Sequence, residues 1–396
     1  MKISKFHRYV LWLFLLIAVL ACESPAPISG HLEAKHPNDK VVYLIQPTTL
    51  QEVGAAYFGE VIDSAQVQPD GTFAFTNPPT FQKPTLLEVV LGQSGKSAKF
   101  LETTDPSRSN FMPIVLQSGE KITIQTREET FQKSFTIKNP SFVNQELLKL
   151  RNVHQEAYQN HLLGKQWQPG DGSQLLEKEH AVRDYQKELM AFADRTTELI
   201  LALVAMRLVS PEGNYERVPE FLVKLCNTWH EQQPNHPWVK QLCALANPEE
   251  LPVLIGDQFP NLKLPMLASD TAMLHDLLGE RLTIVDLWAS WCAPCRKENR
   301  EVLVPLWENY HEEGLQIVAY GLESDVEVWK KAVLRDGADR WQHGSDLQGD
   351  DALFLRQIRV QTIPANFIVD REGLVVAKNL HGEELMEWVM EYFANF

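Results

Sequence analysis

The chain has 396 residues, more than one hydrophobic core usually serves, so we expect two or three domains. Its residues are 44% hydrophobic and 22% charged, which is typical of globular rather than disordered proteins. The net charge of -15 opposes tight binding to nucleic acid, which we therefore exclude as a partner.

The N-terminus has the pattern of an export signal. Three basic side chains precede an apolar run over residues 10–20, which ends at Ala21-Cys22. The run is too short to span a bilayer as a mature helix, but it fits a signal peptide. The letters VLAC at 19–22 resemble the bacterial lipobox, in which the cysteine receives lipid and becomes the new N-terminus. We predict a signal peptide over 1–22 with Cys22 lipidated; the alternative is a secretory signal with an incidental cysteine.

Residues 28–138 predict a small β-sandwich-like domain. Short β-rich runs alternate with turn signals such as Pro69-Asp70-Gly71. The strands predicted from these runs cover residues 41–45, 71–75, 86–90 and 121–124.

Residues 141–248 predict a helical middle region of about four helices, because their apolar side chains recur at helical spacing. The apolar run 199–209 is bounded by charged residues and predicts a buried helix. The histidines of this region show no paired metal-ligand spacing. Cys226 and Cys243 lie on two helical stretches joined by a Pro-rich connection. The sequence is equally compatible with a disulfide between them and with two buried free thiols.

Residues 254–396 predict an α/β domain with a mainly parallel sheet, because strand and helix patterns alternate. The strand predicted over 282–287 leads into a helix over 295–310. The remaining predicted elements are a strand over 315–320, helices over 325–334 and 351–358, a hairpin over 367–377 and a helix over 383–393.

A C-x-x-C motif stands where that first strand meets its helix. Backbone N–H groups and the helix dipole stabilise a thiolate on Cys292 and lower its pKa, while Cys295, one turn deeper, is placed to attack a mixed disulfide. Cys292 is therefore the predicted nucleophile and Cys295 the resolving thiol. A structural zinc site would need a second ligand pair nearby, and haem attachment would need histidine where Arg296 stands, so the redox interpretation remains.

The letters VDLWASWCAPC at 285–295 resemble the active-site stretch of thioredoxins, and residues 254–396 resemble the TlpA-like thiol–disulfide oxidoreductases. The β-rich N-terminal region is similar to a domain often fused upstream of them in bacterial lipoproteins. The resemblance implies that Asp286 is a buried acid able to accept the proton of Cys295, and that Glu298 is the acid of a C-x-x-C-x-x-E pattern. Alternatively, Asp286 is a structural acceptor and Glu298 a solvent-facing charge.

The resemblance also assigns the substrate side of the site. Thr362-Ile363-Pro364 matches the loop in which the family carries a cis-proline facing the cysteines, with the backbone of Ile363 pairing with substrate. Trp291 is expected to shield the disulfide and contact substrate, and Trp288 to pack beneath it. Ala365 departs from the threonine that the family more often has there.

Together these features predict a multidomain, lipid-anchored protein of the cell envelope or periplasm. Its expected activity is dithiol–disulfide exchange with exported proteins, and we expect it to act as a reductase rather than as an oxidase. Its expected partners are disulfide-containing exported proteins and a membrane thiol-electron donor, with cytochrome c maturation as one use. No cofactor is expected, because the dithiol is the redox centre. The alternative is a lipid-anchored binding protein with a regulatory thiol site. A peroxidase is less favoured, because the site supplies a vicinal dithiol.

Overall fold

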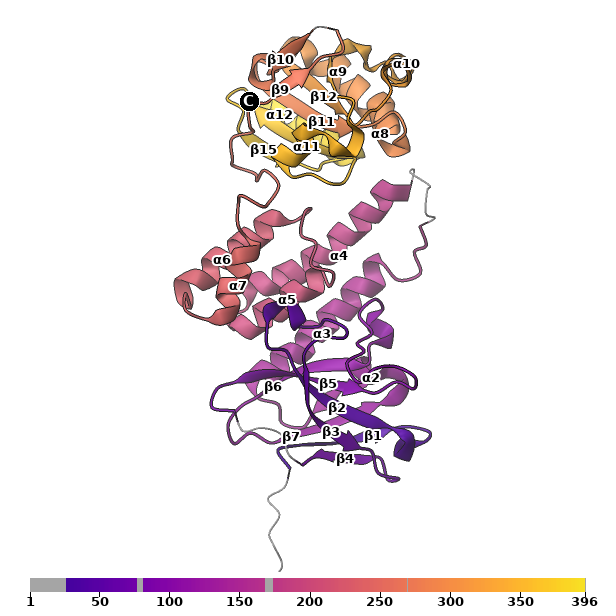
Figure 1. The fold of residues 1–396 in the computed structure, drawn as a ribbon, viewed down its shortest axis with the longest axis vertical. Helices are drawn as coiled ribbons and strands as arrows, with labels where there is room; N and C mark the ends of the chain where they lie inside the picture. The colour runs from indigo at the N-terminus through magenta and orange to yellow at the C-terminus, as the bar shows by residue number, and fades with distance from the viewer. Residues whose placement is uncertain (1–25, 77–80, 168–173, 269, 396) are drawn as a thin grey trace, which may run out of the picture. The chain divides into compact units, whose positions relative to one another are not determined.

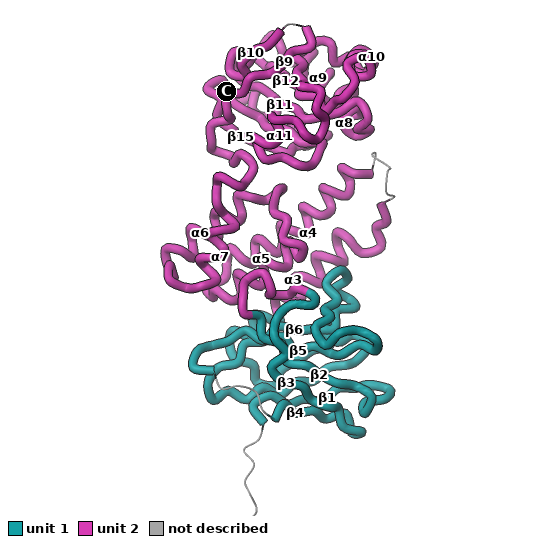
Figure 2. Tube along the Cα trace, in the orientation of Figure 1, with its two compact units in different colours: residues 1–47, 56–148 teal, residues 48–55, 149–396 magenta. Residues whose placement is uncertain are grey.

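The computed structural model describes residues 26–395 except 77–80, 168–173 and 269, so the predicted signal peptide and Cys22 lie outside the described residues. The chain divides into two compact units, the first of residues 1–47 and 56–148 and the second of residues 48–55 and 149–396 (Figure 2). The predicted domain limits at 138/141 and 248/254 remain a prediction. In the described part of the chain, no helix is long and apolar enough to cross a membrane.

The region predicted as a β-sandwich forms two four-stranded sheets in the first unit (Figure 1). Their orders are β4-β1-β7-β8 and β3-β2-β5-β6, and β1 pairs with β7 in parallel. The strands are β1 (Ile28–Glu33), β2 (Val41–Gln46), β3 (Glu60–Gln66), β4 (Thr72–Phe75), β5 (Thr85–Leu91), β6 (Phe111–Leu116), β7 (Ile122–Arg127) and β8 (Thr136–Ile137).

The predicted strands correspond to β2, β4, β5 and β7, whereas β1, β3, β6 and β8 were not predicted. In β7, buried and exposed side chains alternate, as in a strand with one face packed against a core. β6 contains Pro113, which has no N–H to donate, and β6 accordingly lies at the edge of its sheet. A proline inside an apolar run weakens the strand pattern in the sequence, even where the edge of a sheet tolerates it.

Within its described residues, the middle region contains five helices rather than about four. They are α3 (Phe142–His161), α4 (Leu175–Arg195), α5 (Leu199–Val209), α6 (Pro219–Gln232) and α7 (Pro237–Leu245). The boundary between the two units, at Leu148/Lys149, falls within α3. Nearly every side chain of α5 is buried, as predicted for this apolar run. Cys226 on α6 and Cys243 on α7 form a disulfide, which settles the question that the sequence left open.

The C-terminal part of the second unit is built on a five-stranded sheet of order β13-β12-β11-β14-β15. Its strands are β11 (Leu282–Trp288), β12 (Leu315–Gly321), β13 (Gln342–Gly344), β14 (Ala365–Asp370) and β15 (Val375–Lys378), and a separate hairpin pairs β9 (Lys263–Pro265) with β10 (Thr271–Met273). The sheet is mixed rather than mainly parallel, because β14 runs antiparallel to β11 and a tight turn joins it to the antiparallel β15. All seven residues of β11 are buried, as in a strand covered on both faces.

The helix after β11 is continuous but irregular. It comprises α8 (Ala293–Glu298), a π-helical segment (Asn299–Leu303) and α9 (Val304–Tyr310). Pro305 enters just after the π-helical segment; it lacks an N–H and its ring crowds the carbonyl of Glu301, so a regular α-helical bond is lost there. The prediction of a helix over 295–310 is therefore confirmed with a widened turn.

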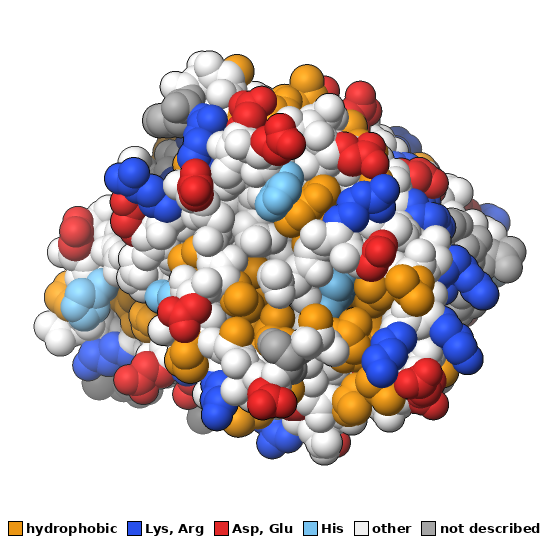
Figure 3. Space-filling view, turned by 90° about the horizontal axis from the view of Figure 1, so that it is seen from above, with side chains coloured by type: hydrophobic (Ala, Val, Ile, Leu, Met, Phe, Trp, Pro, Cys, Tyr) orange, Lys and Arg blue, Asp and Glu red, His pale blue; other side chains and the backbone are white. Residues whose placement is uncertain are grey.

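The other helices of this part are α10 (Val326–Asp336), α11 (Leu353–Ile358) and α12 (Gly382–Asn395). α12 packs beside α9, where the rings of Tyr310 and Phe393 lie 4.8 Å apart. On the face seen in Figure 3, acidic and basic side chains are interspersed and hydrophobic side chains gather between them. No field of a single sign marks a partner on that face.

We expect the Cys226–Cys243 disulfide to stabilise the second unit. Its two cysteines are 17 residues apart, and a bridge closing a loop of that length contributes about 3 kcal/mol by restricting the unfolded chain. Replacing both cysteines with alanine should lower the free energy of unfolding by about that amount in urea titrations followed by circular dichroism. The matched double substitution of Cys292 and Cys295, which close a loop of only 3, should cost about half as much. Identical urea midpoints for wild type and the Cys226/Cys243 variant would contradict this expectation.

Candidate active site

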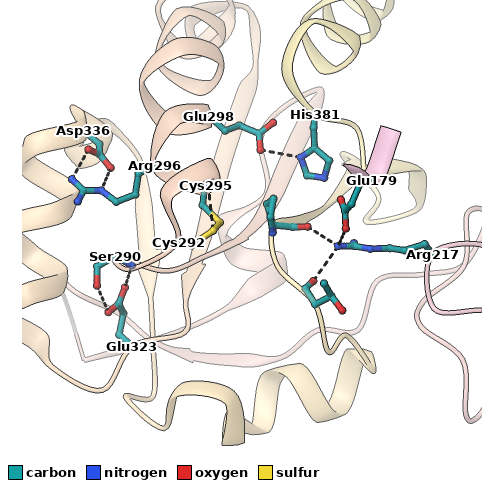
Figure 4. Close-up of a disulfide and its surroundings, with 12 residues drawn as sticks. Glu179, Arg217, Ser290, Cys292, Cys295, Arg296, Glu298, Glu323, Asp336 and His381 are labelled. Carbon is teal, nitrogen blue, oxygen red and sulfur yellow. Dashed lines mark hydrogen bonds and ion pairs between the residues drawn. A yellow bond between two sulfur atoms is a disulfide. The ribbon is translucent and has the colours of Figure 1, made fainter. Parts of the chain in front are cut away.

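The site lies where the buried strand β11 ends and α8 begins. Cys292 is the N-cap residue of α8, and its Sγ accepts a hydrogen bond from the backbone N–H of Cys295 at 3.3 Å. The two cysteines form a disulfide (Figure 4). A sulfur in this position faces the unpaired N–H groups of the first helical turn, which stabilise negative charge. The arrangement therefore favours a thiolate on Cys292 when the pair is reduced.

Two tryptophans flank the disulfide in contrasting environments. Trp288, at the end of β11, is fully buried, and its ring meets that of His343 at 5.8 Å. Trp291, directly before Cys292, is 64% exposed. An exposed indole beside a buried disulfide offers a large contact surface to a substrate. The positions agree with the predicted packing role of Trp288 and leave Trp291 as the candidate substrate contact.

Two buried carboxylates lie behind the cysteines. Asp286 on β11 and Glu298 at the end of α8 are each only 4% exposed. Burial, together with the charge of Glu298, raises the pKa of Asp286 well above its usual range. Glu298 thus points into the domain rather than to solvent, and Asp286 keeps its proton to a higher pH than an exposed aspartate does.

His381 is a site residue that the sequence analysis missed. It is 2% exposed, and its Nδ1 donates a hydrogen bond to Glu298 at 2.9 Å (Figure 4). The backbone N–H of Gly382 donates to the other Glu298 oxygen at 3.1 Å. These bonds fix the carboxylate that faces Asp286. No signal in the sequence connects His381 to a residue 83 positions earlier.

Glu323, also missed, holds the loop before the motif. It follows β12 and is 2% exposed, and its carboxylate accepts hydrogen bonds from the backbone N–H and the hydroxyl of Ser290. Burial raises the pKa of Glu323, while the bonds from Ser290 oppose that rise. A polar residue just after the strand next to β11 was a signal that could have found it, since side chains at the carboxyl ends of neighbouring parallel strands meet at one edge.

Two arginines of the helix after the motif form ion pairs with one buried carboxylate. Arg296 donates two hydrogen bonds of 2.7 Å to Asp336, and Arg300 adds a third at 2.9 Å (Figure 4). The Asp336 side chain is fully buried, and its bonds raise the pKa of Arg296 further. The charge of Arg296 is therefore balanced by Asp336 rather than directed to the disulfide.

The proline loop lies at the end of the sheet from which the cysteine motif follows. The register of β11 and β14 pairs Leu287 with Ala365, so the residues before Ala365 reach the end of β11 from which the motif follows. The Ile363–Pro364 peptide bond is cis. Pro364 is buried, Ile363 is half-buried and Thr362 is exposed. The backbone of this loop is thus presented at the surface next to the disulfide.

Among the residues that the structure describes, no cluster of three or more His, Cys, Asp and Glu side chains could hold a metal ion. The redox chemistry of the site is that of its two cysteines, which take up or release two electrons as dithiol or disulfide.

A mixed sheet with a C-x-x-C motif at the start of the helix after a central strand, and a proline loop opposite, defines a thioredoxin-like domain with a vicinal dithiol centre. Residues 255–378 match the model of the AhpC/TSA family. The chain is 27% identical over 138 residues to thiol-disulfide oxidoreductase ResA of Bacillus cereus, covering 35% of this chain and 76% of that protein. It is 26% identical over 152 residues to thiol:disulfide interchange protein DsbE of Pseudomonas fluorescens, covering 38% and 80%.

A solved thioredoxin domain of a thiol-disulfide oxidoreductase from Bacteroides vulgatus is also similar, at 26% identity and a TM-score of 0.33 over 36% of this chain and 99% of that one. The C-terminal domain is thus an AhpC/TSA-type thioredoxin-like domain, homologous to thiol–disulfide oxidoreductases of the ResA and DsbE type, and the predicted relation to the TlpA-like oxidoreductases is confirmed.

The raised pKa of Asp286 predicts a particular pH dependence of stability. Between about pH 4, where an ordinary Asp titrates, and the higher pKa in the folded protein, only the folded state keeps the Asp286 proton. Stability should therefore fall as pH rises through this window and level off above it, by about 1.4 kcal/mol for each unit of pKa shift. Asp286→Asn removes the titration, so its stability relative to wild type should increase with pH in urea titrations of the oxidised protein. Parallel pH profiles of the two proteins would contradict the assignment.

Proposed function

We propose that this protein is an exported thiol–disulfide oxidoreductase that reduces disulfides in cell-envelope proteins through Cys292 and Cys295. The observation that carries the proposal is the vicinal pair at the junction of β11 and α8. Homology of the domain to proteins named as thiol–disulfide oxidoreductases and interchange proteins supports it over a binding protein with an incidental thiol site.

In the proposed reaction, the Cys292 thiolate attacks one sulfur of a substrate disulfide. A mixed disulfide forms, and the other substrate sulfur leaves as a thiolate that takes up a proton. Cys295 then loses its proton and attacks Sγ of Cys292, which releases the second substrate sulfur as a thiolate that also takes up a proton. The substrate gains two electrons and two protons, and the enzyme is left with the disulfide seen in the structure.

The buried acids are assigned to the second step. Asp286, with its raised pKa, is the proposed acceptor of the Cys295 proton. Glu298 is proposed to tune this transfer, because its charge contributes to the raised pKa of Asp286. His381 holds the Glu298 carboxylate in place. Trp291, Ile363 and Pro364 form the proposed contact with substrate.

The proposed location is the cell envelope or periplasm, with the chain anchored through lipid on Cys22. ResA and DsbE are the kinds of protein to which the domain is homologous, and a reductase outside the cytoplasm needs electrons from within. We therefore propose a membrane thiol-electron donor as one partner and disulfide-containing exported proteins as substrates. Cytochrome c maturation is one proposed use, and rescue of wrongly oxidised cysteines is another.

A trapping experiment tests the order of the two cysteines. Reduced Cys295→Ser protein, incubated with a disulfide-bonded peptide, should accumulate a mixed disulfide at Cys292, because no thiol remains to resolve it. Reduced Cys292→Ser protein should accumulate about tenfold less, because the buried Cys295 lacks the N-cap position. Intact mass and peptide mapping measure both adducts. Equal accumulation would reverse the assignment of the nucleophile, and no adduct in either variant would refute dithiol exchange at this site.

A further inference from the structure

The segment between α5 and α6 contacts the proline loop of the thioredoxin-like domain. One carboxylate oxygen of Glu216 accepts hydrogen bonds from the backbone N–H groups of Gln361 at 2.9 Å and Thr362 at 3.1 Å. These two residues are about 145 positions from Glu216 in sequence, and all of them belong to the second unit. The helical region therefore binds the backbone of the loop that lies beside the disulfide.

Arg217 binds the backbone carbonyl groups of the same loop. Its Nη2 donates to the carbonyl oxygen of Pro364 at 2.9 Å and to that of Thr362 at 3.4 Å (Figure 4). Its Nη1 donates to Asn379 Oδ1 at 2.9 Å, and Glu179 on α4 accepts from Nη2 at 2.7 Å. Glu179 balances the charge of the guanidinium and orients it, so Arg217 is fixed from both sides.

These bonds surround one residue without using it. The N–H of Thr362 and the carbonyl groups of Thr362 and Pro364 are engaged, but the N–H and C=O of Ile363 have no hydrogen bond within the described part of the chain. Hydrogen bonds from or to charged side chains are stronger than neutral ones, so the pair holds the loop firmly. A loop fixed before binding loses less conformational freedom when a partner strand pairs with it.

Space for such a partner lies next to the contact. A cavity of about 820 Å³ is lined by Tyr215 and Glu216 from the helical region and by Leu355, Val360 and Gln361 from the thioredoxin-like domain. The cavity reaches the loop at Gln361, two residues before Ile363.

We propose that Glu216 and Arg217 are positioning residues of the substrate site: they hold the Gln361–Pro364 loop so that the free peptide groups of Ile363 pair with an extended segment beside the substrate disulfide. This inference rests on the proposed function. It narrows the substrate class to disulfides whose flanking polypeptide is extended and can pair with the backbone of Ile363 as an added strand. It also gives the helical region a part in recognition.

Reduction of insulin disulfides by the full chain, with dithiothreitol as electron source, tests the proposal. Arg217→Ala and Glu216→Ala should each raise KM for insulin about tenfold, or about 1.4 kcal/mol, with the effect falling on KM more than on kcat. Glu216→Gln keeps an oxygen that accepts both N–H groups, so it should recover most of the loss. Arg217→Lys keeps the charge but not the fork of donors, so it should stay impaired and serves if Arg217→Ala loses its native circular dichroism.

Arg183→Ala is the matched control. Arg183 pairs with Glu384, a contact that also joins the helical region to the thioredoxin-like domain but is made by α4 and α12 and not by the loop itself. This variant should keep the KM of wild type. If Arg183→Ala raised KM equally, the rise in the Arg217 and Glu216 variants would come from general docking of the two regions, and the proposal would be overturned. An unchanged KM in Arg217→Ala would overturn the proposal as well. A lower KM would also overturn it, because it would show that Arg217 covers the substrate site. If wild type itself reduces no insulin and forms no trapped adduct, the proposed function fails first.

Discussion

The chemistry of this protein depends on the junction at which the buried strand β11 ends and the helix α8 begins. β11 is covered on both faces, which leaves it no freedom to shift its register. The cysteine that follows it is therefore held at the N-cap of α8, where the helix presents free N–H groups to its sulfur. Glu323 secures the intervening turn through Ser290. The position of the sulfur is thus set by burial on one side and by hydrogen bonds on the other.

The same burial creates the acid pair behind the cysteines. A carboxylate on a strand covered on both faces is costly to ionise, and a second carboxylate nearby adds to that cost. Folded proteins retain such groups chiefly where they serve a function. The hydrogen bonds of His381 and Gly382 satisfy the Glu298 carboxylate, so its negative charge is stabilised in place beside Asp286. The domain thereby holds two buried carboxyl groups that interact through their charges, and burial and this interaction raise the pKa of Asp286.

Local features of the site could be read from the sequence, and remote ones could not. The strand, the C-x-x-C turn and the helix after it follow from short patterns with a physical cause, and the proline loop follows from the resemblance to thioredoxins. The widened turn is the effect of a single residue, Pro305, and the mixed sheet is the effect of the direction of β14. Hydrophobic periodicity reveals neither of these features. Glu216, Arg217 and His381 act across separations of 83 to 147 residues, and only the folded chain brings them to the site. The sequence also left the bridge between Cys226 and Cys243 open, because helical spacing does not show how α6 and α7 pack together.

The reduction potential of the Cys292–Cys295 couple tests the central claim most directly. The full chain would be equilibrated with dithiothreitol or glutathione buffers, and thiols at these two positions would be counted by peptide mass, separately from Cys226 and Cys243. We predict a value near that of thioredoxin, about -270 mV, as expected of a reductase. A value near about -120 mV would indicate an oxidase and reverse the direction of electron flow, and a pair that forms no disulfide would contradict the account entirely.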